Sequence, residues 1–79
     1  MFNIELTIGT FENAKQLVMT AMQFDEDIDI KVGRYVIDCK SLMGVFSLDI
    51  SKPVTICVHT DDGNVTAKFM GALHEVGII

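Results

Sequence analysis

Long hydrophobic runs and a basic, signal-like amino terminus are both missing from this sequence, and each absence narrows what the chain can be. The uninterrupted apolar runs span only a few residues, which is too short for a transmembrane helix. The first residues, MFNIELTIG, lack the positive charge and the long apolar core of a secretory signal. We therefore expect a cytoplasmic chain that makes no use of a membrane.

Closely spaced cysteines and histidines are missing as well. Cys39 and Cys57 stand far apart and form no CxxC pair, so neither a zinc site nor a thioredoxin-like motif is indicated. His59 and His74 have no ligand-like spacing to each other or to the cysteines. We expect two free thiols on strands, two histidines with surface or structural roles, and no bound metal or other cofactor.

Basic residues are scarce relative to acidic ones. Six lysines and arginines face eleven aspartates and glutamates, which gives a formal charge of −5. This balance argues against a partner held through nucleic-acid phosphates and against an anionic membrane surface. It favours partners that present basic protein surfaces.

What the chain does have is enough apolar material for a core. Hydrophobic residues make up 49% of its 79 residues, which places it with globular rather than disordered chains. A chain of this length makes one domain, and such a small domain needs a tightly packed apolar core. We find no linker, repeat or low-complexity tract, and we expect residues 1–79 to form a single domain.

Periodicity and turn signals predict seven elements. Alternating apolar and polar residues, separated by turn residues, predict strands at 2–8, 28–32, 35–40 and 54–59. Helical spacing predicts a helix from 12 to about 24, a short helix that begins at Ser41, and a last helix that follows the turn at 61–64. The order β-α-β-β-α-β-α predicts an α+β fold of two layers, in which three helices cover an antiparallel four-stranded sheet.

Particular positions in these elements have predicted roles. Thr10 is expected to cap the first helix, and Gly33-Arg34 is expected to form a tight hairpin turn with positive φ at the glycine. The buried stripe of the first helix is predicted to contain Ala14, Leu17, Val18, Ala21 and Met22, and that of the last helix Val65, Phe69, Leu73 and Val76.

Residues 40–50, KSLMGVFSLDI, closely resemble the KS(I/L)MGVMSLGI stretch of HPr proteins from Gram-positive bacteria, which are phosphocarriers of the sugar phosphotransferase system. The segment FDEDIDIKVGRYVIDCKS is similar to the family pattern YDADVxLxxNGKxVxxKS, and AKQLVMTAMQF is similar to ATxLVxTASKY. The resemblance covers about residues 10 to 60 and implies an open-faced β-sandwich. This fold agrees with the element order predicted above.

The sequence departs from this family at the active site. HPr proteins carry a GxHARP-like motif, in which a histidine accepts phosphate from Enzyme I and an arginine stabilises it. Counting back from Ser41 places Thr10 at the histidine, Glu12 at the arginine and Asn13 at the proline, and no histidine precedes His59. A threonine phosphoester is much more stable than a histidine phosphoramidate and is poorly suited to relay. We therefore expect a degenerate phosphate site and no catalytic activity.

Two other features match functional positions of the family. Ser41 matches the serine that a dedicated kinase phosphorylates in Gram-positive members, although it could also act only as a helix cap. The resemblance also assigns a docking surface for Enzyme I, EIIA proteins and the kinase. The residues that match this surface, which could instead merely cap the core, are Phe11, Lys15, Leu42, Met43 and Phe46.

The sequence therefore favours a non-catalytic HPr-like protein that binds protein partners as a regulator or adaptor. By resemblance these partners are Enzyme I, EIIA, the serine kinase or a transcription regulator. Two alternatives remain: a functional phosphocarrier that uses another acceptor, and a diverged domain with an unrelated binding role.

Overall fold

The computed structural model describes residues 1–79, which form seven elements in the predicted order. The strands form one antiparallel sheet in the order β1-β4-β2-β3. The predicted α+β class, with a four-stranded sheet and three helices, is therefore confirmed. The elements are β1 (Phe2–Thr7), α1 (Phe11–Ala21), β2 (Ile28–Val32), β3 (Tyr35–Asp38), α2 (Leu42–Phe46), β4 (Pro53–Val58) and α3 (Gly63–Glu75).

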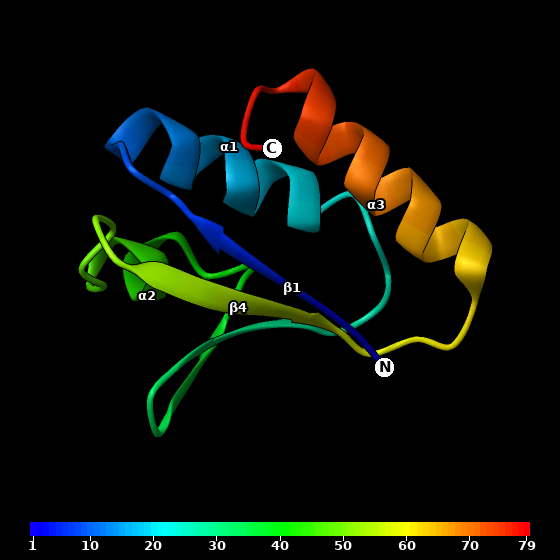
Figure 1. The fold of residues 1–79 in the computed structure, drawn as a ribbon, viewed down its shortest axis with the longest axis horizontal. Coiled ribbons are helices and arrows are strands. Elements are labelled where there is room, and N and C mark those ends of the chain that lie inside the picture. Colours follow the sequence, from blue (N-terminus) through cyan, green and yellow to red (C-terminus); the bar gives the residue numbers. More distant parts are fainter.

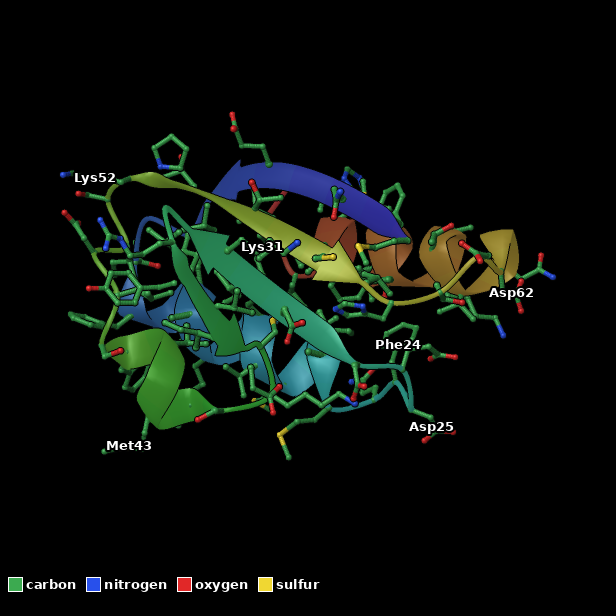
Figure 2. The ribbon with its side chains drawn as sticks, turned by 90° about the horizontal axis from the view of Figure 1, so that it is seen from below. Phe24, Asp25, Lys31, Met43, Lys52 and Asp62 are labelled. Carbon is green, nitrogen blue, oxygen red and sulfur yellow. The ribbon has the colours of Figure 1, made fainter.

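The helices cover one face of the sheet and leave the other face bare. Figure 1 shows α1 and α3 next to each other on the same side of β1 and β4. The short helix α2 contacts both α1 and the edge strand β3. From below, in Figure 2, the strands lie in front of the helices, with no helix between them and the viewer. No helix combines the length and the hydrophobicity that crossing a membrane requires.

The core lies between the sheet and the helices. On the sheet side, Ile56 of the central strand β4 is paired with Ile4 of β1 and with Ile30 of β2, so three isoleucines line up across the covered face. On the helix side, Phe69 of α3 is fully buried and meets Phe24 edge to face, with ring centroids 5.5 Å apart. Ile30, Ile56 and Phe69 belong to one cluster of 15 buried residues, and the partly buried Ile4 and Phe24 pack against it. This core holds the two layers together.

Several element boundaries differ from the sequence prediction because local side chains end or start the elements. Helix α1 ends at Ala21 rather than near residue 24, because the hydrogen bonds after it span three residues instead of four. The Phe24 N–H, for example, donates to the Ala21 carbonyl. Strand β3 ends at Asp38, whose carboxylate accepts the Lys40 N–H at 2.9 Å and turns the chain. Helix α3 begins earlier than predicted, at Gly63, because Asp62 caps it.

Two side chains that were predicted to be buried are exposed. Met22 was predicted in the buried stripe of α1 but is 65% exposed, because α1 has already ended and Met22 is its C-cap. Val76 is likewise exposed, as the C-cap of α3. Cys57 alternates with core residues and points to the bare face, yet it is fully buried there. Its neighbours on the adjacent strands are Asn3 and Asp29.

Two glycines have defined structural roles. Gly33 has φ +58 in the two-residue turn between β2 and β3, whereas Arg34 does not have positive φ, as in a type II′ hairpin turn. The predicted hairpin glycine is therefore confirmed. Gly44 of α2 lies against β3: a Cβ built on it would be 2.8 Å from Cγ2 of Ile37 and 3.3 Å from Oγ of Ser41. Gly44 thus allows α2 to approach β3 closely.

We expect Gly44→Ala to lower the free energy of unfolding by about 1 kcal/mol. Overpacking against the stiff, β-branched Ile37 costs about 1–3 kcal/mol, which exceeds the roughly 1 kcal/mol gained from alanine's helix propensity. The matched control is Gly71→Ala in α3, where nothing lies within 4 Å of the added Cβ. This variant should be more stable than the parent by roughly 0.5–1 kcal/mol. Urea unfolding of both variants measures the difference, and equal stabilisation by both would contradict the close contact.

Candidate functional site

The site that the sequence assigns to phosphate is the N-terminus of α1, where the chain leaves the end of β1. Thr10 is the N-cap, and its Oγ1 accepts the Asn13 N–H at 3.0 Å. The Asn13 side chain donates in turn to the Ile8 carbonyl at 3.0 Å. Just before the helix, the Gly9 N–H donates to the Ile50 carbonyl at 2.8 Å. Free amides at a helix N-terminus bind anions, and the chain's own side chain has taken one of them here.

Charge at this end of α1 opposes a bound phosphate. Glu12 lies in the first turn and is exposed, with Gln16 Nε2 3.3 Å from its carboxylate. A carboxylate there stabilises the helix dipole by about 0.3–1 kcal/mol. Toward a phosphate about 4 Å away it would be repulsive by up to roughly 4 kcal/mol, and by less when exposed. The nearest basic side chain along the helix is Lys15, one turn later and exposed.

Neither histidine is bonded to Thr10. His59 follows the end of β4 that pairs with the start of β1, whereas Thr10 follows the other end of β1. The length of β1 therefore separates them, which is on the order of 20 Å at about 3.3 Å per residue. His59 Nε2 is 2.6 Å from Asp29 Oδ2 on the bare face, and His74 lies on α3 with Nδ1 3.3 Å from the Ile79 carbonyl. Each ring thus has a partner other than the residues at the N-terminus of α1.

Ser41 lies at the N-cap of α2. Its Oγ accepts the Gly44 N–H at 3.2 Å, so the hydroxyl contributes to the short helix in the unmodified protein. The side chain of the preceding residue, Lys40, donates to the Phe24 carbonyl at 2.6 Å. This bond ties the segment before α2 to the end of α1, so the Lys40 ammonium already has an acceptor.

The five residues matched to a docking surface do come together, and we call them the α1–α2 patch: Phe11, Lys15, Leu42, Met43 and Phe46. The rings of Phe11 and Phe46 pack edge to face across the two helices, with centroids 5.6 Å apart. Met43 is 82% exposed and Phe11 64% exposed, and Met43 points outward from α2 in Figure 2. Exposed apolar side chains gathered on two adjacent helices are typical of a surface that another protein covers.

Sequence reasoning missed two methionines that extend this apolar surface along α1. Met19 is half exposed, and Met22 is more exposed still. At 100° per residue, Met22 lies about 20° and Met19 about 80° around the helix from Phe11, on the side away from the core. A helical wheel drawn from Phe11 could have found Met19, whereas the exposure of Met22 follows from its position at the end of α1. Flexible methionines are suited to surfaces that adapt to different partners.

The two thiols are free and buried. Burial, and after it the charges of Asp38 and Asp29, raise the pKa of the Cys39 thiol to about 12. At neutral pH almost none of it is the reactive thiolate, so Cys39 cannot serve as a nucleophile in place of a histidine. Cys39 directly follows β3 rather than lying on a strand, whereas Cys57 lies on β4 as predicted.

The sheet with helices on one face, and a helix N-terminus at the end of its first strand, define an open-faced β-sandwich of the phosphocarrier type. The family model described as the PTS HPr component phosphorylation site matches residues 11–76, and the chain belongs to this HPr family of the phosphotransferase system. Members of the family are phosphocarriers rather than enzymes in the usual sense, and they interact with other proteins such as the phosphotransferase enzymes. The matched region begins just after Thr10.

Solved structures share this fold at low sequence identity. HPr-C-His from Thermoanaerobacter tengcongensis superposes with a TM-score of 0.74 at 24% identity, covering 96% of this chain and 90% of that one. The histidine-containing phosphocarrier protein of Mycoplasma gives 0.72 at 17% identity, covering 99% and 98%. The phosphocarrier protein HPr from Bacillus anthracis gives 0.68 at 24% identity, covering 91% and 90%. The resemblance to HPr proteins found in the sequence is therefore confirmed.

Proposed function

We propose that this HPr-family protein is a single domain, residues 1–79, that acts by binding protein partners and does not relay a phosphoryl group. The observation that carries the proposal is the hydroxyl of Thr10 and the carboxylate of Glu12 at the N-terminus of α1, the residues that counting back from Ser41 assigns to the family's histidine and arginine. Phosphoryl relay needs a nucleophile whose phosphorylated form is reactive, with positive charge beside it. Here a hydroxyl engaged in helix capping stands beside a carboxylate.

The α1–α2 patch supports a role in binding. It keeps large apolar side chains exposed on two helices, although burying them would stabilise a small domain. Replacing the histidine removes the chemistry without disturbing this surface, because Thr10 still caps α1 and holds Phe11 beside Phe46. The partners that fit are Enzyme I, EIIA proteins, the serine kinase or a transcription regulator.

Ser41 gives this binding protein a route to regulation. A phosphate on its Oγ would add two negative charges beside Leu42 and Met43 of the patch, at the positive end of α2. The bond to Gly44 N–H shows that the hydroxyl lies at the start of the helix, where a negative group is tolerated. Modification would change the charge of the docking surface and leave its apolar side chains in place.

The absence of phosphoryl relay is tested with Enzyme I and phosphoenolpyruvate. We expect no acid-labile phosphate on this protein under conditions that phosphorylate a histidine-containing HPr in the same tube, because the N-terminus of α1 has no histidine and both His59 and His74 are bonded to other groups. Radiolabel or intact-mass measurement before and after acid treatment provides the readout. Labile phosphate on either histidine, transferred onward to an EIIA protein, would show a working phosphocarrier.

The docking role is tested by capturing partners with Met43→Asp and Phe46→Asp. A buried carboxylate in the interface should weaken binding by about tenfold or more, whereas both variants should remain folded by circular dichroism. Asn64→Asp is the matched control, since it adds the same charge in the first turn of α3, away from the patch. If partners bind all three proteins equally well, the α1–α2 patch is not the docking surface.

Modification of Ser41 is tested with the serine kinase that acts on family members, ATP and mass spectrometry. We expect one phosphate in the parent and none in Ser41→Ala. A protein that stays unmodified at high kinase concentration would remove the regulatory role and leave Ser41 as a helix cap. The kinase's usual HPr substrate, present in the same reaction, shows that the enzyme is active.

A further inference from the structure

Strand β3 is an edge of the sheet with unpaired backbone groups. The Cys39 N–H donates to the Ile28 carbonyl at 2.9 Å. This bond shows which residues of the segment direct their backbone groups toward β2 and which direct them outward. In an antiparallel ladder every second residue bonds to the neighbouring strand, so Tyr35 and Ile37 bond to β2. Val36 therefore directs its N–H and C=O outward. No strand covers this edge, and Figure 1 shows the hairpin that carries it, near residue 33, extending away from the helices.

The side chains along this edge have a charge pattern that complements itself. Val36 and Asp38 point to the bare face, and Val36 is 60% exposed. Arg34 directly precedes β3, in the hairpin turn, and is exposed. Arg34 forms no ion pair within the molecule, and neither does Asp38. Asp38 moreover lies directly across the ladder from Asp29, a like charge. The edge thus presents an unpaired cation at one end, an unpaired anion at the other, and an apolar residue midway.

We propose that β3 is a self-association edge, where a second copy of this chain adds its own β3 in antiparallel orientation and joins the two sheets into one. With the two-fold axis at Val36, this residue faces Val36 of the second copy, and the two exchange their free backbone hydrogen bonds. Arg34 then faces Asp38 of the second copy, and Asp38 faces Arg34. On the other face, the 69% exposed Tyr35 covers Ile37 of the second copy.

The other edge of the sheet does not offer this match. Strand β1 carries Glu5 as its only charged side chain, so an antiparallel copy of β1 would meet no opposite charge. An edge strand that is only apolar can pair with many other strands. The positive charge at one end of β3 and the negative charge at the other favour a partner strand that places a negative charge opposite the first and a positive charge opposite the second. The chain's own β3 is such a strand. Because the edge is short and each copy carries a charge of −5, the dimer is weak and reversible.

Charge reversal tests this register. Sedimentation of the parent, up to about 1 mM, should show a mass that rises toward the dimer. Arg34→Asp opposes two carboxylates at each end, and Asp38→Arg opposes two guanidinium groups, so each variant alone should lose association by about tenfold or more. Mixing the two restores both Arg–Asp pairs, and the mixture should associate as the parent does. A mixture that stays monomeric while the parent dimerises would overturn the proposed register.

Asp38 also accepts the Lys40 N–H, so Asp38→Arg can fail to fold for that reason alone. Two further measurements test the proposal without this variant. Val36→Lys places a charge on the edge without touching that bond and should abolish association. In the parent, amide exchange should slow with concentration at Val36 and its neighbours 34–38. A parent that is monomeric at every concentration, or protection along β1 instead, would refute the proposal, and neither result would bear on the role of the α1–α2 patch.

Discussion

The N-terminus of a helix has a few backbone amides without partners, and the group that satisfies them determines what this end of the helix can do. In this protein Thr10 accepts one of these N–H bonds, and Asn13 returns a bond to the end of β1. The amides that a phosphate would use are thus partly occupied by the chain itself, and Glu12 makes the surroundings negative. Each of these three residues favours the helix. The same position that serves group transfer in a phosphocarrier serves stability here.

The open-faced architecture explains why surfaces other than the N-terminus of α1 remain accessible. Helices cover only one face of the sheet, so the core forms between two layers and every edge and outer helix face stays accessible. Gly44 connects two of these surfaces. Because it has no side chain, α2 lies directly on Ile37 of β3, and this contact sets the position of Leu42 and Met43 on α2. The edge strand and the α1–α2 patch are therefore positioned by one close contact.

The sequence predicts the elements well where one face of an element is buried. Ile28 and Ile30 alternate with polar residues because the sheet is covered on one side, and the helix stripes of α1 and α3 arise in the same way. Boundaries were predicted less well, because they depend on single hydrogen bonds such as Asp38 to the Lys40 N–H. Met22 was misplaced because helical periodicity carried on past the residue where α1 ends.

Other features could not be read from periodicity at all. The Lys40 ammonium bonds to the Phe24 carbonyl, 16 residues away, and no local pattern specifies such a contact. The burial of Cys57 on the bare face depends on side chains of the adjacent strands. The strand order, which makes β3 an edge, likewise follows from long-range pairing. At the N-terminus of α1, the resemblance to the family indicated which residues to compare. Only the structure showed which hydrogen bonds Thr10 and Asn13 form.

Charge differs between what phosphoryl relay needs and what the proposed binding role needs. A phosphocarrier needs positive charge where phosphate is received, whereas this chain has Glu12 there and a net charge of −5. At the patch the apolar side chains supply contact area, and Lys15 is the only charged residue among the five. Apolar area of this kind gives affinity without requiring a reactive group. Binding through apolar contacts and phosphoryl relay thus make opposite demands on charge at the start of α1, and the carboxylate of Glu12 at that position agrees with the proposed binding role.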